Sequence, residues 1–277
     1  MHPVLLEIGP IKLYSYGLMI AIGFLLVLYL MQREAPKWGL DPDLIGELCF
    51  WGLFFGVIGT RAAHIIMYSE NYAWNDPFGW INITRGGLVF QGAIPTTLLY
   101  LYIRLRQKKV SFWPVTDLAM PYIPIAQAFG RFGCFMYGCC YGQRADHLWC
   151  AVQFPPESPP YQNHLAHFPE FNPALNPFSY PVHPTQLYSV VLLLGISGLL
   201  FLLRKRFASV SGACFAFYFI LYGVKRFIVE HYRGDDNPRN LGLDMISNQQ
   251  VFCLLMILAG AMLFAYLRKR SQTAITG

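Results

Sequence analysis

The sequence predicts an all-α integral membrane protein with seven transmembrane helices, its amino terminus outside and its carboxyl terminus in the cytoplasm. Three observations lead to this prediction. The chain of 277 residues is 55% hydrophobic and only 13% charged, whereas about a quarter of the residues of a soluble domain are charged. Seven apolar runs are long enough to span a bilayer. Basic residues cluster on alternate connections between these runs.

A transmembrane helix needs roughly 20 mostly apolar residues. The runs that we expect to span are residues 13–31, 45–68, 87–103, 114–136, 185–203, 209–229 and 247–267. The fourth and sixth runs contain charged residues within their apolar sequence. The first run follows no basic patch and precedes no small-residue cleavage site, so we expect it to be a retained span. One polytopic membrane domain is predicted over residues 1–277.

Clusters of Lys and Arg set the predicted orientation of the spans. They follow the first, third, fifth and seventh runs, at Arg33, Lys37, Arg104, Arg106, Lys108, Lys109, Arg204, Lys205, Arg206, Arg268, Lys269 and Arg270. The opposite connections hold only Arg85, Arg144, Arg233 and Arg239. Basic residues accumulate on the cytoplasmic side of a membrane. Because they lie in short clusters between apolar runs, the net charge of +6 does not indicate a nucleic-acid partner.

A proline-rich connection of about residues 137–184 is predicted to form a loop on the outer side. It contains nine of the 19 prolines, which cannot support a continuous helix. Long loops in compact proteins often serve as lids or binding loops. A passive connector is the alternative.

Polar side chains lie at one depth of the predicted spans, near the outer leaflet. They are Tyr16, Arg61, Gln91, Arg131, His183, Lys225, Arg226 and Glu230. A charge inside a span costs several kcal/mol and therefore usually faces a partner or a water-filled cavity. The common depth predicts a polar chamber that opens outward. Arginine suits phosphate and carboxylate groups, so the chamber is a candidate site for a lipid phosphate.

Structural roles compete with this interpretation at each position. An arginine near the end of a span commonly extends to the membrane interface. Arg226 and Glu230 are four residues apart and share a helix face, so they can form a purely structural ion pair. Glycines around Arg131, including Gly133, permit close approach of a lipid, but small residues also serve helix packing.

Four of the seven cysteines lie close together in the sequence, at Cys134, Cys139, Cys140 and Cys150. In an oxidising compartment we expect a disulfide between Cys150 and either Cys139 or Cys140. The spacing C-x4-CC-x9-C is not one that zinc sites usually show. No metal site is therefore predicted. Cys49, Cys214 and Cys253 lie in apolar runs and are expected to be small core residues.

Several segments together carry a family resemblance. They are YSYGLMIAIGF (14–24), GTRAAHIIMY (59–68), GGLVFQG (86–92), DLAMPYIPIAQAFGRFG (117–133), HPTQLY (183–188), YGVKRFIVEHYR (222–233) and ISNQQ (246–250). In this order they resemble the prolipoprotein diacylglyceryl transferases, multi-pass enzymes of the bacterial plasma (inner) membrane. The resemblance covers nearly the whole chain.

The resemblance implies an enzyme of lipoprotein biosynthesis. Such an enzyme transfers the diacylglyceryl group of phosphatidylglycerol to the thiol of a lipobox cysteine in a prolipoprotein signal peptide. A thioether forms and glycerol phosphate is released. No cofactor is implied. The resemblance also assigns residues: the catalytic group would be Tyr16, Gln91, Arg226 and Glu230, and the lipid-binding group Arg61, Arg131, Gly133 and His183.

Three positions depart from the family pattern. Gln91 stands where the best-studied members have a histidine, and an amide cannot take up a proton. Cys134 replaces an asparagine, and Cys139 replaces an acidic residue. Other candidates for the base are Tyr16, His64 and His183, or arginines could lower the pKa of the substrate thiol. The alternatives left open are a paralogue with another acceptor or phospholipid, and a non-catalytic phospholipid-binding protein.

Overall fold

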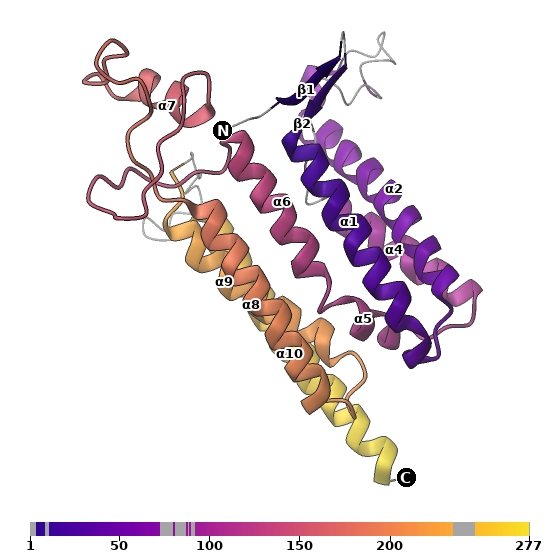
Figure 1. Ribbon diagram of the computed structural model, residues 1–277. Helices are drawn as coiled ribbons and strands as arrows, with labels where there is room; N and C mark the ends of the chain where they lie inside the picture. The colour runs from indigo at the N-terminus through magenta and orange to yellow at the C-terminus, as the bar shows by residue number, and fades with distance from the viewer. Residues whose placement is uncertain are drawn as a thin grey trace. The chain divides into compact units, whose positions relative to one another are not determined.

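The computed structural model describes residues 4–8, 11–72, 80, 87, 89, 92–234 and 247–276 (Figure 1). The chain forms two compact units. The first contains Met1–Tyr29 and Thr116–Gly277, and the second contains Leu30–Val115. Helices α1 and α5 each cross the boundary between the units. Each unit is described by itself below.

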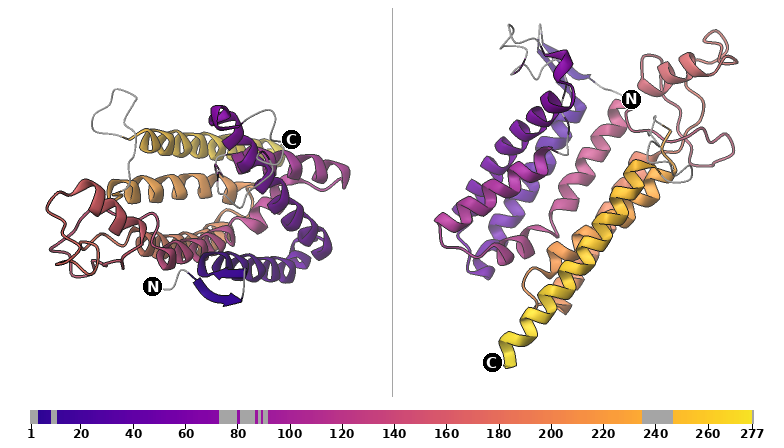
Figure 2. Two further views of the ribbon diagram at one scale, coloured as in Figure 1. Left: turned by 90° about the horizontal axis from the view of Figure 1, so that it is seen from above. Right: turned by 180° about the vertical axis from the view of Figure 1, so that it is seen from behind.

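The first unit begins with a small antiparallel hairpin, and the rest of its regular structure is helical. Its elements are β1 (Val4–Ile8), β2 (Ile11–Tyr14), α1 (Ser15–Glu34), α5 (Phe112–Ala119), α6 (Ile123–Tyr137), α7 (Pro159–His167), α8 (Thr185–Arg206), α9 (Ala213–His231) and α10 (Asn248–Thr276). Helix α9 packs against both α10 and α8, and α8 packs against α6. Figure 2 shows α8, α9 and α10 running side by side.

The second unit is an antiparallel pair of helices, the longer of which has a short 3-10 turn at each end. Its elements are η1 (Ala35–Trp38), α2 (Pro42–Met67), η2 (Ser69–Asn71) and α4 (Ala93–Gln107). Helix α2 begins at Pro42 because the Asp41 carboxylate caps it, accepting the backbone N–H of Asp43 at 3.0 Å. The α2–α4 contact is close enough for the Thr97 hydroxyl to donate to the Gly52 carbonyl at 3.0 Å.

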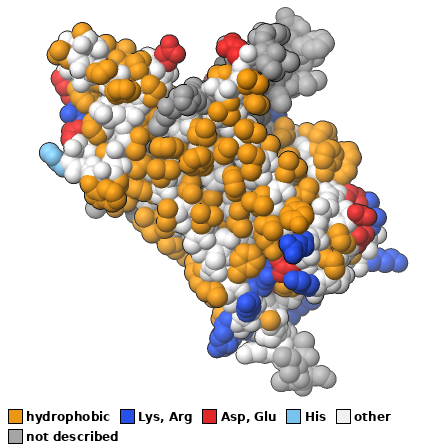
Figure 3. Space-filling model, viewed as in Figure 1, with side chains coloured by type: hydrophobic (Ala, Val, Ile, Leu, Met, Phe, Trp, Pro, Cys, Tyr) orange, Lys and Arg blue, Asp and Glu red, His pale blue; other side chains and the backbone are white. Residues whose placement is uncertain are grey.

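Four of the described helical segments are long and apolar enough to cross a membrane: Ser15–Trp38, Pro42–Met67, Thr185–Arg206 and Asn248–Thr273. Their large apolar side chains are exposed, for example Val191 and Leu202 on α8 and Met262 on α10. Figure 3 shows hydrophobic side chains covering much of the face in that view. Apolar surface of this extent requires a non-aqueous neighbour. The prediction of a helical integral membrane protein is confirmed at this level.

The fourth predicted run, residues 114–136, is not one helix. Helix α5 ends at Ala119 and α6 begins at Ile123. Pro121 and Pro124 lie at this break, and a proline has no backbone N–H to donate to the preceding turn. The hydroxyl of Ser197 on α8 donates to the Pro121 carbonyl at 2.7 Å, which satisfies one of the acceptors that the break leaves free.

The proline-rich connection, here called the Pro-rich segment (residues 138–184), is packed rather than extended. Tyr141, Phe154 and Val182 form a buried apolar cluster, against which Phe135 of α6 and Val152 pack. Short backbone bridges join different parts of the segment, and α7 begins with the prolines at 159 and 160. A small core of this kind is not expected of a passive connector.

One group of backbone hydrogen bonds joins the ends of three helices, and we call it the backbone junction. Residues 141–143, after α6, lie between His183, before α8, and residues 232–234, after α9. Gly142 donates to the His183 carbonyl at 3.0 Å, and His183 donates to the Gln143 carbonyl at 3.0 Å. Gln143 donates to the Tyr232 carbonyl at 2.9 Å, and Gly234 donates to the Tyr141 carbonyl at 3.2 Å.

The backbone junction requires a glycine at position 142. A Cβ atom there would lie 2.5 Å from the His183 Cβ and 2.7 Å from the Tyr232 carbonyl oxygen. Backbone atoms cannot move aside as a flexible side chain can. Any larger residue would therefore separate the three chain segments.

We expect Gly142→Ala to destabilise the protein by about 1–3 kcal/mol, the usual cost of overpacking. The matched control is Gly198→Ala on α8, where nothing lies within 4 Å of the added methyl group. That control should be neutral or slightly stabilising, because alanine favours a helix over glycine. Thermal unfolding in detergent measures both. Equal melting temperatures for the two variants would contradict the close approach at Gly142.

Candidate functional site

A buried ion pair lies on α9 near its carboxyl end. Arg226 Nη2 lies 2.8 Å from Glu230 Oε2, and the Glu230 side chain is only 1% exposed. Arg233, in the backbone junction, approaches the same carboxylate oxygen, with Nε at 4.0 Å. The predicted i, i+4 pairing of Arg226 with Glu230 is confirmed. Glu230 therefore holds two guanidinium groups, and the sequence analysis did not place Arg233 at the site.

Lys225 is a buried cation of the same region. It was among the polar side chains of the predicted chamber, although the resemblance did not assign it a role. It is 3% exposed, and its Nζ has no hydrogen-bond partner in the part of the chain that the structure describes. Arg131, Arg226 and Arg233 all lie within electrostatic range of it. The Tyr222 ring lies below the ammonium group, 5.4 Å from Nζ to the ring centroid.

Arg131 on α6 completes a group of four cations that we call the cationic cluster: Arg131, Lys225, Arg226 and Arg233. Arg131 lies within electrostatic range of Arg233 and of the Tyr222 hydroxyl. Glu230 is the carboxylate paired with this cluster. Bringing like charges together in a low-dielectric region is unfavourable unless an anion compensates them. The arrangement is therefore typical of a site for an anionic group.

Tyr16 lies in the first turn of α1, next to the same part of α6. A Cβ atom on Gly133 would be 3.2 Å from the Tyr16 Cα, so glycine allows the two helices to approach here. Arg131 lies within electrostatic range of the Tyr16 hydroxyl. Three predicted site residues, Tyr16, Arg131 and Gly133, are thus neighbours in the structure. Gly133 acts through helix packing.

The HPTQLY segment holds the turn that follows α6. Helix α6 ends at Gly138, which has φ of 88°. The Thr185 hydroxyl donates to the Cys140 carbonyl at 2.7 Å, and the Gln186 side-chain amide donates to the Cys139 carbonyl at 2.8 Å. Both side chains are buried at the start of α8. Their role in the motif is to fix the backbone of the two adjacent cysteines.

His183 belongs to the backbone junction through its main chain. Its Nδ1 lies 3.2 Å from the Tyr188 hydroxyl, and its ring lies beside that of Tyr232, at 5.2 Å between centroids. Burial lowers the pKa of the His183 imidazole. The ring is therefore neutral near pH 7 and can accept a proton.

Three thiols meet beside Arg131. The Sγ atoms of Cys134, Cys139 and Cys140 all lie within 4.8 Å of one another. The predicted disulfide from Cys150 to Cys139 or Cys140 is wrong, because each of these cysteines is a free thiol. The side chain of Cys150 turns instead to Tyr188, with Sγ 3.7 Å from the hydroxyl. The spacing in the sequence did not identify this cluster, since the turn after α6 decides which thiols meet.

Arg61 lies in the second unit, where its guanidinium has structural partners. Nε donates to the Trp80 carbonyl at 2.9 Å, and Nη1 donates to the Gly87 carbonyl at 3.0 Å. The group also lies 5.1 Å above the Tyr72 ring. His64 is bound nearby, with Nδ1 2.7 Å from the Tyr72 hydroxyl. These contacts hold Tyr72, Trp80 and Gly87 against α2. Gln91 lies outside the described residues.

A family model described as prolipoprotein diacylglyceryl transferase matches residues 3–266. The chain belongs to the prolipoprotein diacylglyceryl transferase family. It is 34% identical over 272 residues to the phosphatidylglycerol–prolipoprotein diacylglyceryl transferase of Clostridium tetani, covering 98% of this chain and 100% of that protein. The enzymes of that name from Photobacterium profundum and Serratia proteamaculans are each 30% identical, over 268 and 275 residues.

These two alignments extend over nearly the whole length of both aligned proteins. They cover 95% of this chain and 93% of the Photobacterium protein, and 98% of this chain and 95% of the Serratia protein. The family resemblance deduced from ordered motifs is thereby confirmed. The cationic cluster, Tyr16 and the backbone junction all lie inside the matched range.

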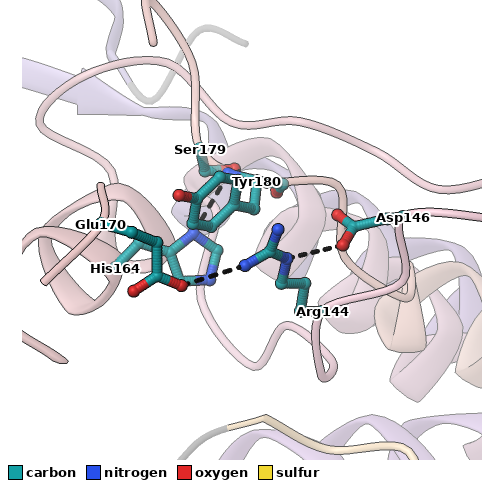
Figure 4. A network of polar contacts seen from close by, with 6 residues as sticks. All are labelled: Arg144, Asp146, His164, Glu170, Ser179 and Tyr180. Carbon is teal, nitrogen blue, oxygen red and sulfur yellow. Dashed lines mark hydrogen bonds and ion pairs between the residues drawn. The ribbon is translucent and has the colours of Figure 1, made fainter. Parts of the chain in front are cut away.

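The Pro-rich segment of this family member carries a second polar network, away from the cationic cluster. Arg144 lies between two carboxylates, with Nε 2.7 Å from Asp146 and Nη1 3.4 Å from Glu170 (Figure 4). Its guanidinium lies 3.7 Å from the centroid of the Tyr180 ring. The Tyr180 backbone N–H donates to His164 Nδ1 at 3.2 Å. The network joins α7 to both ends of the segment.

His164 makes the stability of this network depend on pH. Burial lowers the pKa of its imidazole below the ordinary value of 6.5, and the nearby Arg144 lowers it further. Below that pH the unfolded chain takes up a proton that the folded chain does not. Stability is therefore full above about pH 6.5 and falls as the pH drops toward the lower, folded-state pKa.

We expect the melting temperature to fall more steeply on acidification in the parent protein than in His164→Asn. Asparagine retains an acceptor for the Tyr180 N–H but cannot be protonated. The free-energy loss should be up to about 1.4 kcal/mol per pH unit below 6.5. Thermal unfolding between about pH 7.5 and 5.5 measures it. His167→Asn is the control, since His167 is exposed on the same helix. Parallel pH profiles for His164→Asn and the parent would exclude this role for His164.

Proposed function

We propose that this protein transfers the diacylglyceryl group of phosphatidylglycerol to the thiol of a lipobox cysteine in prolipoprotein signal peptides. The reaction forms a thioether and releases glycerol phosphate. Two kinds of support agree. Relatives named phosphatidylglycerol–prolipoprotein diacylglyceryl transferase align over nearly the whole chain. The first unit also holds a buried cationic cluster suited to a phosphate group, and this cluster is the observation that carries the proposal.

The charge of the cluster suits the donor lipid. Arg131, Lys225, Arg226 and Arg233 carry four positive charges, and the paired carboxylate of Glu230 offsets one. A phosphodiester supplies a negative charge and acceptor oxygens for these donors. The Lys225 ammonium, buried without a hydrogen-bond partner in the described chain, would gain one when the lipid binds.

The same residues would assist the chemical step. The thiolate attacks the glyceryl carbon, and the bond from that carbon to the phosphate oxygen breaks. Negative charge then increases on the departing phosphate. Fixed cations in a water-poor site stabilise this charge without having to reorganise. Glu230 positions the guanidinium groups of Arg226 and Arg233, which makes it a positioning residue rather than a base.

A proton must leave the acceptor thiol, because the thiolate is the nucleophile. Within the first unit, His183 and Tyr16 are side chains near the cluster that could accept or relay it. His183 is neutral and lies beside Tyr232, next to Arg233 in the chain. The resemblance assigned Gln91 to the catalytic group, where an amide can orient substrate but cannot remove a proton.

The proposal places the enzyme in the bacterial plasma membrane as one polytopic domain. Seven apolar runs support seven spans, and the Lys and Arg distribution supports an outer amino terminus and a cytoplasmic carboxyl terminus. The Pro-rich segment then lies on the outer side, where prolipoprotein signal peptides emerge. Its partners are the membrane lipid and the signal peptide, and no nucleic acid takes part. Arg61 binds the carbonyls of Trp80 and Gly87 within the second unit.

A second function remains as a candidate on the basis of Gln91. A protein that kept the cationic cluster but lost proton transfer would bind phosphatidylglycerol without transferring its diacylglyceryl group. The two functions share lipid binding and differ in the product formed.

The transferase is tested with purified protein, phosphatidylglycerol and a peptide that carries a lipobox cysteine. We expect mass spectrometry to detect a diacylglyceryl adduct on that cysteine. Arg131→Gln should slow its formation by about 10²–10³-fold, the usual cost of removing one stabilising donor. Arg206→Gln, at the far end of α8, removes the same charge outside the cluster and should leave the rate unchanged.

The outcomes separate the two functions. An adduct that depends on Arg131 supports the transferase. No adduct, together with Arg131-dependent lipid binding, excludes the transferase and supports the lipid-binding alternative. No lipid binding at all excludes both.

Lys225 gives a separate test of the phosphate site. Lys225→Met keeps the volume of the side chain and removes its charge. If the ammonium binds the lipid phosphate, the Kd for phosphatidylglycerol should rise roughly tenfold or more, as expected for a lost charged hydrogen bond of about 1.5–3 kcal/mol. The unliganded protein should be more stable, since a buried uncompensated charge is gone. Native mass spectrometry and thermal unfolding measure the two effects. Unchanged lipid affinity would remove Lys225 from the site.

A further inference from the structure

Three cysteine thiols converge at the end of α6 although the mechanism above uses none of them. Cys134 is buried in the last turn of the helix, and Cys139 and Cys140 follow the glycine that ends it. Their Sγ atoms lie within 4.8 Å of one another. Zinc–thiolate bonds of about 2.3 Å place sulfur atoms roughly 3.8 Å apart. The three sulfurs would need to contract by no more than about 1 Å to share one ion.

The surrounding structure holds these thiols together. Gly138 and Cys140 both have positive φ, at 88° and 59°. A non-glycine residue adopts that conformation at a cost of about 1 kcal/mol or more, so its environment must enforce it. Buried Thr185 and Gln186 do so by binding the carbonyls of Cys140 and Cys139. The site is therefore built before any ligand arrives.

Positive charge lies beside the thiols. Arg131 and Arg233 both lie within electrostatic range of Cys140. Three thiolates and a divalent ion carry a net charge of −1, which these guanidinium groups can compensate. Thiolate ligands select thiophilic ions such as Zn²⁺ and Cu⁺. The cluster includes no carboxylate or imidazole among the described residues.

We propose that Cys134, Cys139 and Cys140 form a three-thiolate Zn²⁺ site whose fourth coordination position is open to the acceptor thiol. Zinc sites with three protein ligands and an open position are of the catalytic type, whereas structural sites have four. A thiol that coordinates zinc is deprotonated. The zinc ion would thus generate the thiolate in this chain, where Gln91 replaces the histidine of the best-studied family members.

This role rests on the proposed transferase function. The acceptor thiol binds the ion as a thiolate, and its proton passes to water. The sulfur lone pair then forms the bond to the glyceryl carbon, while the electrons of the breaking carbon–oxygen bond leave with the phosphate, beside Arg131. The product is a thioether, a weaker ligand than a thiolate, so it dissociates and the position reopens. Nothing is oxidised or reduced.

Metal content is measured first on the full-length protein, purified in detergent without chelators or metal-affinity resin. We expect about one zinc per chain. The single variants Cys134→Ser, Cys139→Ser and Cys140→Ser should each lose most of it. Cys150→Ser is the matched control, because it is a partly buried thiol of the same Pro-rich segment outside the cluster. X-ray absorption should show three sulfur neighbours at about 2.3 Å. Thermal unfolding establishes that each variant is folded.

Cobalt then tests the open position. In Co²⁺-loaded protein, a lipobox peptide should shift the thiolate charge-transfer bands, and the same peptide with Ser for Cys should not. Removing the metal should reduce transfer at least tenfold, and Zn²⁺ should restore it. A spectrum indifferent to the peptide thiol, or full activity without metal, would overturn the catalytic role.

The two hypotheses fail separately. Zinc-free protein that still forms the adduct, or a disulfide between two of the three cysteines found by differential alkylation, removes the metal site and leaves the transferase intact. Cysteine-dependent zinc in a protein that forms no adduct establishes the metal site and removes the transferase.

Discussion

The first unit depends on the hydrogen bonds of the backbone junction. Residues 141–143 pair with His183 on one side and with residues 232–234 on the other. These contacts join the end of α6, the start of α8 and the end of α9, three places far apart in the sequence. The positions of Arg131, Arg233 and the three thiols all follow from this connection. Gly142 makes this connection possible, because only a residue without a side chain fits between the backbone segments at His183 and Tyr232.

Glu230 allows the helices of the first unit to hold a group of cations close together. Charges buried in a low-dielectric region repel one another and lose hydration. Glu230 offsets part of this cost by contacting both Arg226 and Arg233. Among the described residues no carboxylate contacts Lys225 in this way, and its ammonium lies against the Tyr222 ring. An anionic headgroup would relieve the repulsion between these cations when it binds. Features that raise the affinity for the lipid therefore lower the stability of the protein without lipid.

The HPTQLY and GCC segments are bound to each other although Cys140 and His183 are 43 positions apart in the sequence. Thr185 and Gln186 bind the carbonyls of the two cysteines, and His183 binds the adjacent Gly142 and Gln143. A departure from the family pattern at Cys134 and Cys139 therefore changes a region that is firmly held in place. The substituted residues form a thiol cluster beside Arg131. They therefore lie next to the proposed reaction centre and not on a distant surface.

The sequence by itself determined the helical membrane class, the family and the pairing of Arg226 with Glu230. Each of these depends on local properties: apolar length, ordered motifs and the four-residue repeat of a helix. It also indicated Arg131 and Tyr16, since a polar residue in an apolar run is conspicuous. Several helix bounds were predicted to within a few residues, but α4 begins six residues later and α10 ends nine residues later than predicted, and the break at Pro121 and Pro124 divides the fourth run.

Only the tertiary structure decided which distant groups meet. Cys150 is a free thiol rather than the predicted disulfide partner, and the Sγ atoms of Cys139 and Cys140 lie within 4.8 Å of that of Cys134. Arg61 has backbone partners in its own unit, whereas Arg233 and Lys225 belong to the cationic cluster. Such contacts depend on the angles of turns and on hydrogen bonds between remote segments. Neither is encoded in the spacing of residues along the chain, so they become visible only when the chain is folded.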